Sequence, residues 1–145
     1  MHGQLTVGAV CCLVNIAIHA AIMAWVVVAA RRASRATQGL GAARRQIAVM
    51  SATVLVLLIA HALEVAVWAL VYRVVNLVPA GDTFYFAFVN YTTLGYGDIL
   101  PSPEWRMLGP ITAMNGVLLF GWSTAVIFEV LRTSAGALRN LPTHS

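Results

Sequence analysis

The sequence is poor in charge. Only 10% of its 145 residues are charged, lysine is absent, and five acidic residues stand against nine arginines. Soluble domains carry about 25% charged residues. Because this chain is also 60% hydrophobic, it cannot cover an apolar core with a polar surface, which excludes a water-soluble globular protein. Cys11 and Cys12 are adjacent in an apolar stretch, which excludes a disulfide framework and a cysteine-based metal site. We interpret them as small residues on a helix surface.

Three apolar runs have the length that a membrane-spanning helix needs, about 20 residues. They cover residues 5–30, 47–72 and 107–131, and the second contains His61 and Glu64 as its strongly polar residues. The sequence therefore predicts an all-α integral membrane protein with three transmembrane helices. Arginines follow the first run and no positive charge precedes it, the reverse of a cleaved signal peptide, so we expect a retained anchor helix.

Most arginines flank the membrane on one side, after the first and third runs. They are Arg31, Arg32, Arg35, Arg44, Arg45, Arg132 and Arg139. Arg73 and Arg106 alone flank the connection between the second and third runs. The positive-inside rule then predicts an outer N-terminus, a cytoplasmic C-terminus and a multi-pass protein of the cell membrane. Arginines spread beside apolar runs, rather than gathered on one patch, argue against nucleic-acid binding.

The outward connection holds a short apolar piece, residues 83–91, followed by Thr-Leu-Gly-Tyr-Gly-Asp over residues 93–98. We expect Asp82 to cap a short re-entrant helix that directs the negative end of its dipole into the membrane. Gly95 and Gly97 allow backbone angles that turn successive carbonyls to one side. Unpaired carbonyls at membrane depth are viable only where they line a water-filled or ion-filled path.

With this string, the sequence resembles the potassium channel family. The resemblance implies a selectivity filter formed by Thr93, Leu94, Gly95, Tyr96, Gly97 and Asp98. It implies potassium sites at the carbonyls of Thr93, Leu94, Gly95 and Tyr96 and at the Thr93 hydroxyl, with K⁺ as the permeant ion. Tyr96 would brace the filter and Asp98 would lie at the outer mouth. It also implies a homotetramer of identical subunits, because one chain supplies one part of a carbonyl ring. The commonest string of the family has valine at the position of Leu94, a mild change because the carbonyl coordinates.

The resemblance covers about residues 47–131, and we expect the whole chain to divide into four parts. The expected layout is an additional N-terminal helix over 1–30, an arginine-rich loop over 31–46, a pore domain over 47–131 and a short tail over 132–145. Within the pore domain we expect an outer helix over 47–73, a pore helix over 82–92, the filter over 93–98 and an inner helix over 107–131. The tail is too short for a ligand-sensing domain, so the stimulus that opens the channel is not evident from the sequence.

Two positions of the pore helix depart from the family pattern. Many members have an acid and a tryptophan behind the filter, where this chain has Val89 and Phe86. Neither side chain forms hydrogen bonds, so we expect packing, together with Tyr85, Asn90 and Thr92, to support the filter.

The third run places Gly116, Phe120, Thr124 and Phe128 at four-residue spacing, on one stripe of a helix. Under the channel interpretation, this stripe lines the cavity, Thr124 offers a hydroxyl to hydrated cations, and Phe128 narrows the inner mouth as a gate. Gly116 and Gly121 lie close to the positions at which members of the family have flexible glycines in the inner helix. The alternative is that the aromatic rings pack between helices and the glycines permit close approach. Glu129 either attracts cations or pairs with Arg132.

Four polar residues fall at mid-membrane depth: Asn15, His19, His61 and Glu64. Polar groups there are costly and are normally paired. We expect them to join the additional helix to the outer helix; a proton sensor is the alternative, because histidine titrates near neutral pH. A metal site is disfavoured by the loose spacing of the ligands. The sequence shows no nucleophile–base pair, which argues against an enzyme.

Arginine clusters of this kind bind anionic lipid head groups; the alternative, which we prefer, is that these arginines set the membrane topology alone. They are Arg31, Arg32, Arg35, Arg44 and Arg45. Two other functions stay open. One is a weakly selective cation channel or a filter-bearing subunit of a potassium transporter, and the other is a non-conducting regulatory membrane protein.

Overall fold

The computed structural model describes residues 2–37, 39 and 41–139, with side chains through Ser134. The described part of the chain contains four helices and no β-strand: α1 covers His2–Ala36, α2 covers Ala42–Val74, α3 covers Thr83–Tyr91 and α4 covers Leu108–Arg139. The apolar windows of the three long helices have mean hydropathies of 2.3, 2.5 and 1.6. At about 1.5 Å per residue, each exceeds the roughly 30 Å of a bilayer core. The predicted all-α integral membrane fold is confirmed.

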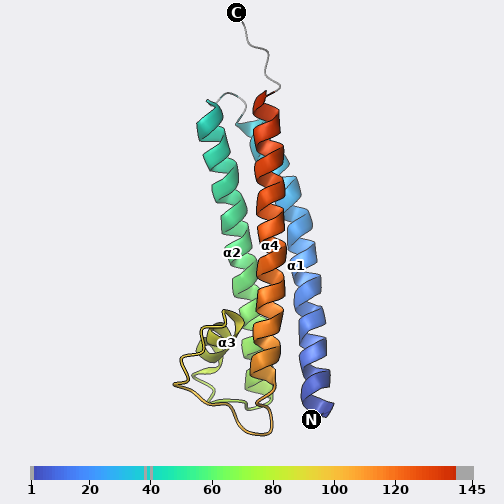
Figure 1. Cartoon of the computed structure of the whole chain (residues 1–145), viewed down its shortest axis with the longest axis vertical. Coiled ribbons are helices and arrows are strands. Elements are labelled where there is room, and N and C mark those ends of the chain that lie inside the picture. The colour runs from blue at the N-terminus through green and yellow to red at the C-terminus, as the bar shows by residue number, and fades with distance from the viewer. Residues whose placement is uncertain (1, 38, 40, 140–145) are drawn as a thin grey trace, which may run out of the picture.

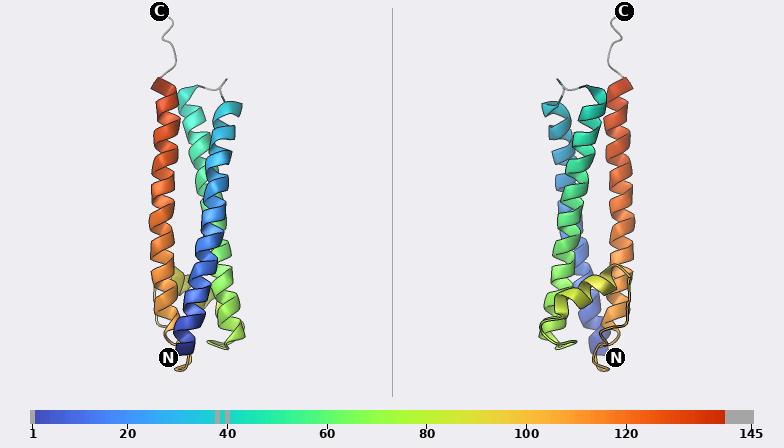
Figure 2. Two further views of the ribbon diagram at one scale, coloured as in Figure 1. Left: turned by 90° about the vertical axis from the view of Figure 1, so that its right-hand side faces the viewer. Right: turned by 90° about the vertical axis from the view of Figure 1, so that its left-hand side faces the viewer.

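The three long helices run side by side, and α2 is antiparallel to α1 and α4 (Figure 1). The short α3 lies across one end of α2 and α4, at the end of the molecule where α1 begins (Figure 2). The turn between α1 and α2 and the C-terminal end of α4 lie at the opposite end. We call these the filter end and the arginine end.

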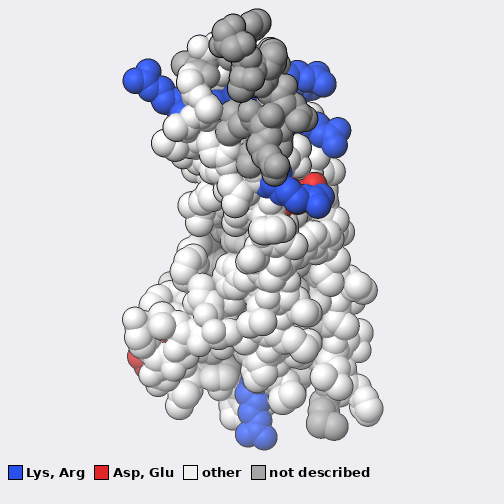
Figure 3. Space-filling view, turned by 45° about the horizontal axis from the view of Figure 1, so that its top comes forward, with Lys and Arg blue, Asp and Glu red and all other residues white. Residues whose placement is uncertain are grey.

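Charge follows the same division. Figure 3 shows most of the visible arginine side chains around the arginine end and one at the filter end, while residues other than Arg, Asp and Glu cover most of the length between the ends. Only 28–33% of each apolar window is buried within the chain. The remaining apolar surface needs lipid or a neighbouring protein against it.

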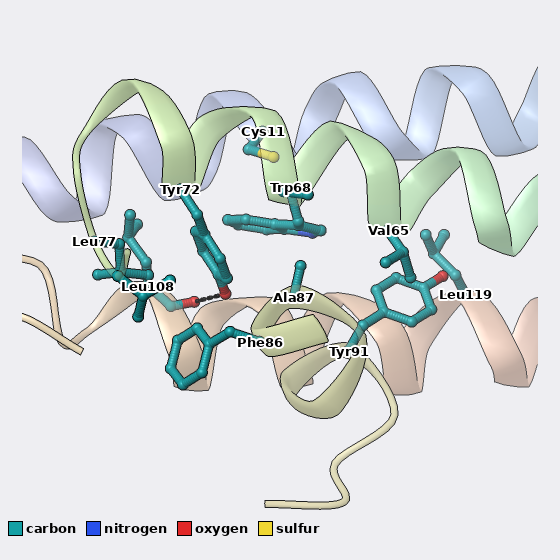
Figure 4. Packing of buried hydrophobic residues seen from close by; sticks show 12 residues of the cluster. Cys11, Val65, Trp68, Tyr72, Leu77, Phe86, Ala87, Tyr91, Leu108 and Leu119 are labelled. Carbon is teal, nitrogen blue, oxygen red and sulfur yellow. Dashed lines mark hydrogen bonds between the residues drawn. The ribbon is translucent and has the colours of Figure 1, made fainter. Parts of the chain in front are cut away.

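Near the filter end, large side chains from α2 pack over α3 and α4 (Figure 4). Trp68 and Tyr72 are fully buried against Ala87 of α3, and the Tyr72 hydroxyl contacts the Leu108 carbonyl at 3.5 Å. Near the arginine end, a second cluster that includes Met23, Val49 and Val130 joins α1, α2 and α4. These two clusters fix the helices that carry the site.

The helices differ from the predicted layout mainly at the arginine end. The predicted loop over 31–46 shrinks to residues 37–41, because α1 continues to Ala36 and α2 begins at Ala42. The third long helix likewise continues beyond 131 to Arg139, so much of the predicted tail is helical; residues 140–145 lie outside the described part. Alanine and arginine are strong helix formers, a property that hydropathy does not measure. The pore helix differs from its predicted range by one residue at each end.

Candidate functional site

Helix α3 is wedged between α2 and α4 by its buried face. Phe86, Ala87, Val89 and Tyr91 are buried, and the ring centroid of Phe86 lies 5.6 Å from that of Tyr72. Phe86 and Val89, the two positions that depart from the family pattern, are therefore packing residues. The same two side chains line a cavity of about 170 Å³ that Gly95 and Gly97 border.

Asp82 precedes α3 as predicted, but its side chain makes no capping hydrogen bond. Its backbone has φ −100° and ψ −6°, whereas a capping residue needs extended angles to bring its side chain to the first amides. The Thr83 hydroxyl instead donates to the Ala80 carbonyl at 3.2 Å. The expectation of an aspartate cap is corrected accordingly.

The chain leaves α3 through amide bonds to the helix end. The Thr93 amide donates to the Asn90 carbonyl and the Leu94 amide donates to the Val89 carbonyl, each at 2.9 Å. Beyond this point φ alternates in sign: it is positive at Thr93 (61°), Gly95 (57°) and Gly97 (76°) and not at the residues between them. Thr93 adopts the left-handed region although it is not glycine, which marks a constrained backbone.

Alternating left-handed and right-handed residues turn successive carbonyls of a strand toward the same side. Within the described part of the chain, the carbonyls of residues 93–97 accept no hydrogen bond. A row of backbone oxygens without protein donors has the chemistry to replace the hydration shell of a cation.

Residues 93–98, the predicted filter segment, are hydrogen-bonded to α3 at their C-terminal end. The Tyr85 hydroxyl donates to the Asp98 carboxylate at 2.6 Å. Because the carboxylate accepts a hydrogen bond that only the protonated phenol can donate, the pKa of Tyr85 is raised above its ordinary value. Of the three residues expected to support the filter, Tyr85 is the one whose side chain reaches it.

The other two expected supports bond to α3 itself. The Asn90 amide donates to the Phe86 carbonyl at 2.7 Å, and the Thr92 hydroxyl donates to the Phe88 carbonyl at 2.8 Å. Asn90 also faces Gly109 of α4, where an added Cβ would lie 3.0 Å from the Asn90 amide oxygen. Both residues therefore shape the end of α3 and its seat on α4.

The stripe on α4 divides into two halves. At Gly116, an added Cβ would lie 2.0 Å from the Tyr91 carbonyl oxygen, so this glycine permits the close approach of α3. The Phe120 ring packs on Tyr91 and on His61, with centroids 5.3 and 4.6 Å apart. Both contacts agree with the packing alternative, whereas Phe120 is also 37% exposed, so that the lining of a cavity by this stripe stays a prediction.

Toward the arginine end, the side chains of the same stripe are exposed in the single chain. The Thr124 hydroxyl donates to the Phe120 carbonyl at 2.9 Å and is exposed, and Phe128 is 65% exposed. An added Cβ at Gly121 would meet nothing within 4 Å. The Glu129 carboxylate pairs with Arg132 at 2.9 Å.

The four intramembrane polar residues meet in one buried network. His19 Nδ1 lies 2.8 Å from Glu64 Oε1, and His61 Nδ1 lies 3.0 Å from Glu64 Oε2. The Asn15 amide donates to the Glu64 main-chain carbonyl at 3.3 Å. The additional helix is thus joined to α2 by hydrogen bonds in the middle of the bundle.

Three further members of this network were not expected from the sequence. The Tyr91 hydroxyl donates to Glu64, Ser123 lies 3.0 Å from His61 Nε2, and Asn115 accepts hydrogen bonds from Asn15 and Trp68 at 3.0 Å. A signal was available on α4, because Asn115 and Ser123 are eight residues apart and so share one face of the helix.

Comparison with known proteins places this geometry in a family. A family model described as an ion channel matches residues 54–133, more than half of the chain, and spans most of α2, all of α3, the filter segment and most of α4. No curated protein and no solved structure matches the chain. On the evidence of that match and of two long helices flanking a re-entrant helix, the chain belongs to the ion channel family of two-transmembrane pore domains, with a third, N-terminal helix added.

Proposed function

We propose that the protein is a potassium-selective channel that conducts K⁺ passively through a homotetrameric filter. The observation that carries this proposal is the backbone of residues 93–97, with alternating φ and unbonded carbonyls. Potassium would bind between carbonyls of Thr93, Leu94, Gly95 and Tyr96 contributed by each subunit. Such oxygens offset the cost of removing water from the ion.

A single chain supplies one row of carbonyls, so a closed ring requires further copies. The apolar surface left open on the long helices supports subunit contacts as well as lipid contacts. Four copies are proposed from the resemblance of the filter string. We further propose that the filter end faces outward in the cell membrane, because the arginine end carries the positive charge.

Flux from liposomes tests the proposal. Purified protein should pass K⁺ and Rb⁺ but not Na⁺ down matched gradients, and Ba²⁺ should block the flux. Gly95→Ala should abolish the K⁺ flux, because φ at Gly95 is 57°, an angle that residues with a side chain rarely adopt. Gly81→Ala is the matched control, since an added Cβ there meets nothing within 4 Å.

The outcomes separate the alternatives. Equal K⁺ and Na⁺ flux would favour a weakly selective cation channel, and no flux from a folded assembly would favour a non-conducting regulatory protein. Light scattering of the detergent-solubilised protein measures the number of subunits, and a mass other than that of four chains would contradict the tetramer.

We also propose that the arginine end binds an anionic phospholipid. A cleft of about 310 Å³ between the three long helices is lined by Arg31 and Arg35, with the apolar Val27 and Val130 beside them. Glu129 also lines it, and its carboxylate is paired with Arg132. This pairing of cations with apolar walls fits a phosphate head group and the start of an acyl chain. Arg45, at the start of α2, is buried and its Nη2 has no hydrogen-bond partner within the described part of the chain.

A further inference from the structure

Three metal-ligating side chains converge in the middle of the bundle: His19 from α1 and His61 and Glu64 from α2. Their ligand atoms all lie within 4.8 Å of one another. The side chains of His19 and Glu64 are fully buried, whereas that of His61 is 14% exposed. His61 is therefore the ligand that an entering ion would meet first.

The cluster carries uncompensated negative charge when both imidazoles are neutral. Glu64 is paired only with His19 and His61, and no arginine lies within ion-pair distance of it in the part of the chain that the structure describes. The other groups bonded to Glu64 are neutral: the Tyr91 hydroxyl of α3 donates to its carboxylate, and the Asn15 amide of α1 donates to its main-chain carbonyl. A buried carboxylate with no permanent cation beside it is costly in the apolar part of a membrane protein, so a bound cation would stabilise it.

The second nitrogen of each histidine faces the same hydroxyl. Ser123 Oγ of α4 lies 3.0 Å from His61 Nε2 and 3.5 Å from His19 Nε2. A hydroxyl has one proton to donate and two lone pairs, so Ser123 can donate to one Nε2 atom and accept from the other, or accept from both. When both Nε2 atoms carry the protons, both Nδ1 lone pairs face the Glu64 carboxylate, and this pair of tautomers presents three ligand atoms to a cation; the Tyr91 hydroxyl also lies 2.9 Å from His61 Nδ1.

We propose that His19 Nδ1, His61 Nδ1 and the Glu64 carboxylate form a binding site for a divalent transition-metal ion of the zinc class. Two imidazole nitrogens and one carboxylate are a donor set that such ions favour, whereas Mg²⁺ and Ca²⁺ favour oxygen ligands. Zinc bonds of about 2.1 Å place tetrahedral ligand atoms about 3.4 Å apart. The two His–Glu contacts of 2.8 and 3.0 Å would lengthen slightly to reach this spacing, and all three ligand atoms already lie within 4.8 Å of one another.

Occupancy would connect parts of the chain that are far apart in the sequence. The ligands come from α1 and α2, Ser123 of α4 orients both imidazoles, and Glu64 also holds Tyr91 at the end of α3. An ion there would fasten the additional helix to the pore domain. The site depends on the helix packing and not on potassium conduction.

Co²⁺ binding to the purified assembly tests the site, because tetrahedral Co²⁺ has visible ligand-field bands that do not depend on flux. The four histidines allow a clean background, since His2→Asn with His144→Asn leaves His19 and His61 as the only histidines. We expect one Co²⁺ per chain, displaced by Zn²⁺. His19→Gln or His61→Gln should weaken binding more than about 100-fold, and Ser123→Ala about tenfold.

Glutamine retains an amide that can donate to Glu64, so these variants should keep the fold, and circular dichroism checks this. If His19→Gln does not fold, His61→Gln decides. Cys11→Ser is the matched control, because Cys11 is the buried thiol of α1 and should not affect the bands. Absence of the bands, binding unchanged in both glutamine variants, or binding lost in Cys11→Ser would overturn the proposal. A protein that binds Co²⁺ but passes no K⁺ would contradict the proposed function alone.

Discussion

The hydroxyl of Tyr85 and the carboxylate of Asp98 lie 2.6 Å apart and connect α3 to the far end of residues 93–98, the proposed filter. Both residues are exposed within the single chain. Because Phe86 and Val89 offer no hydrogen bond from behind the filter, this contact is the side-chain hydrogen bond by which α3 holds the segment. This hydrogen bond is how Tyr85 would support the filter, as the sequence led us to expect.

Tyr85→Phe should therefore lower the K⁺ over Na⁺ preference several-fold while the assembly stays intact. The reason is that the Asp98 end of the filter loses its link to α3 and moves more freely. Flux of Rb⁺ against Na⁺ in liposomes measures the effect. Asp98→Asn should be milder, because its amide oxygen still accepts the phenol hydrogen. Tyr85→Phe with unchanged selectivity would show that the hydrogen bond does not support the filter.

The same contact predicts a pH dependence. The Asp98 carboxylate raises the pKa of Tyr85 above its ordinary value near 10. A raised pKa means that the contribution of the bond to stability is present in full below about pH 10 and is lost as pH rises through the higher value. Selectivity of the wild type should therefore stay constant from pH 7 to 9 and fall only in stronger alkali. A fall already between pH 7 and 9, absent in Tyr85→Phe, would contradict this assignment.

Gly116→Ala should destabilise the protein far more than Gly121→Ala. A Cβ at Gly116 would lie 2.0 Å from the Tyr91 carbonyl oxygen, a main-chain atom, whereas a Cβ at Gly121 would meet nothing within 4 Å. Overpacking costs about 1–3 kcal/mol, and here α3 itself has to move. Thermal unfolding followed by tryptophan fluorescence compares the two variants. Equal unfolding temperatures would show that α3 does not depend on this approach.

The sequence predicts the fold well because its signal is strong and local. Long uncharged runs separate three membrane helices, and the string at residues 93–98 marks the re-entrant segment between them. Helix ends are predicted less well, because arginine ends an apolar run without ending a helix: α1 continues through Arg35 to Ala36. The prediction that Asp82 caps α3 is wrong because capping depends on the backbone angles of that residue. The amino-acid sequence does not show these angles.

The polar network is the part that linear spacing cannot predict. His61 and Glu64 are three residues apart and visibly share a face of α2, but Tyr91 and Ser123 reach them only through the packing of α3 and α4. Whether a polar residue joins such a network depends on the rotation of its helix. Ser123 is buried and the adjacent Thr124 is exposed, although both carry hydroxyls in the same apolar run.

Phe128→Ala should raise K⁺ flux and the access of a quaternary-ammonium blocker applied from the arginine end. Phe128 is 65% exposed on α4 and is free to meet its counterparts in a tetramer, where an apolar constriction closes a pore by excluding water. Phe128→Leu keeps an apolar side chain of similar bulk and should behave as the wild type. Flux and blocker access unchanged in Phe128→Ala would end the gate hypothesis.

Arg31→Gln combined with Arg35→Gln should weaken the binding of anionic phospholipid. The two guanidinium groups line the cleft between the three long helices, and each cation near a membrane surface contributes about 1 kcal/mol to such binding. Their joint removal should cost about 2 kcal/mol, a roughly thirtyfold loss of affinity. Fluorescent phosphatidylglycerol titrated into the detergent-solubilised protein measures it. Arg73→Gln, at the filter end, is the control and should bind as the wild type does. A loss in Arg73→Gln equal to that in the double variant would mean that the protein attracts anionic lipid by net charge and that the cleft is not a site.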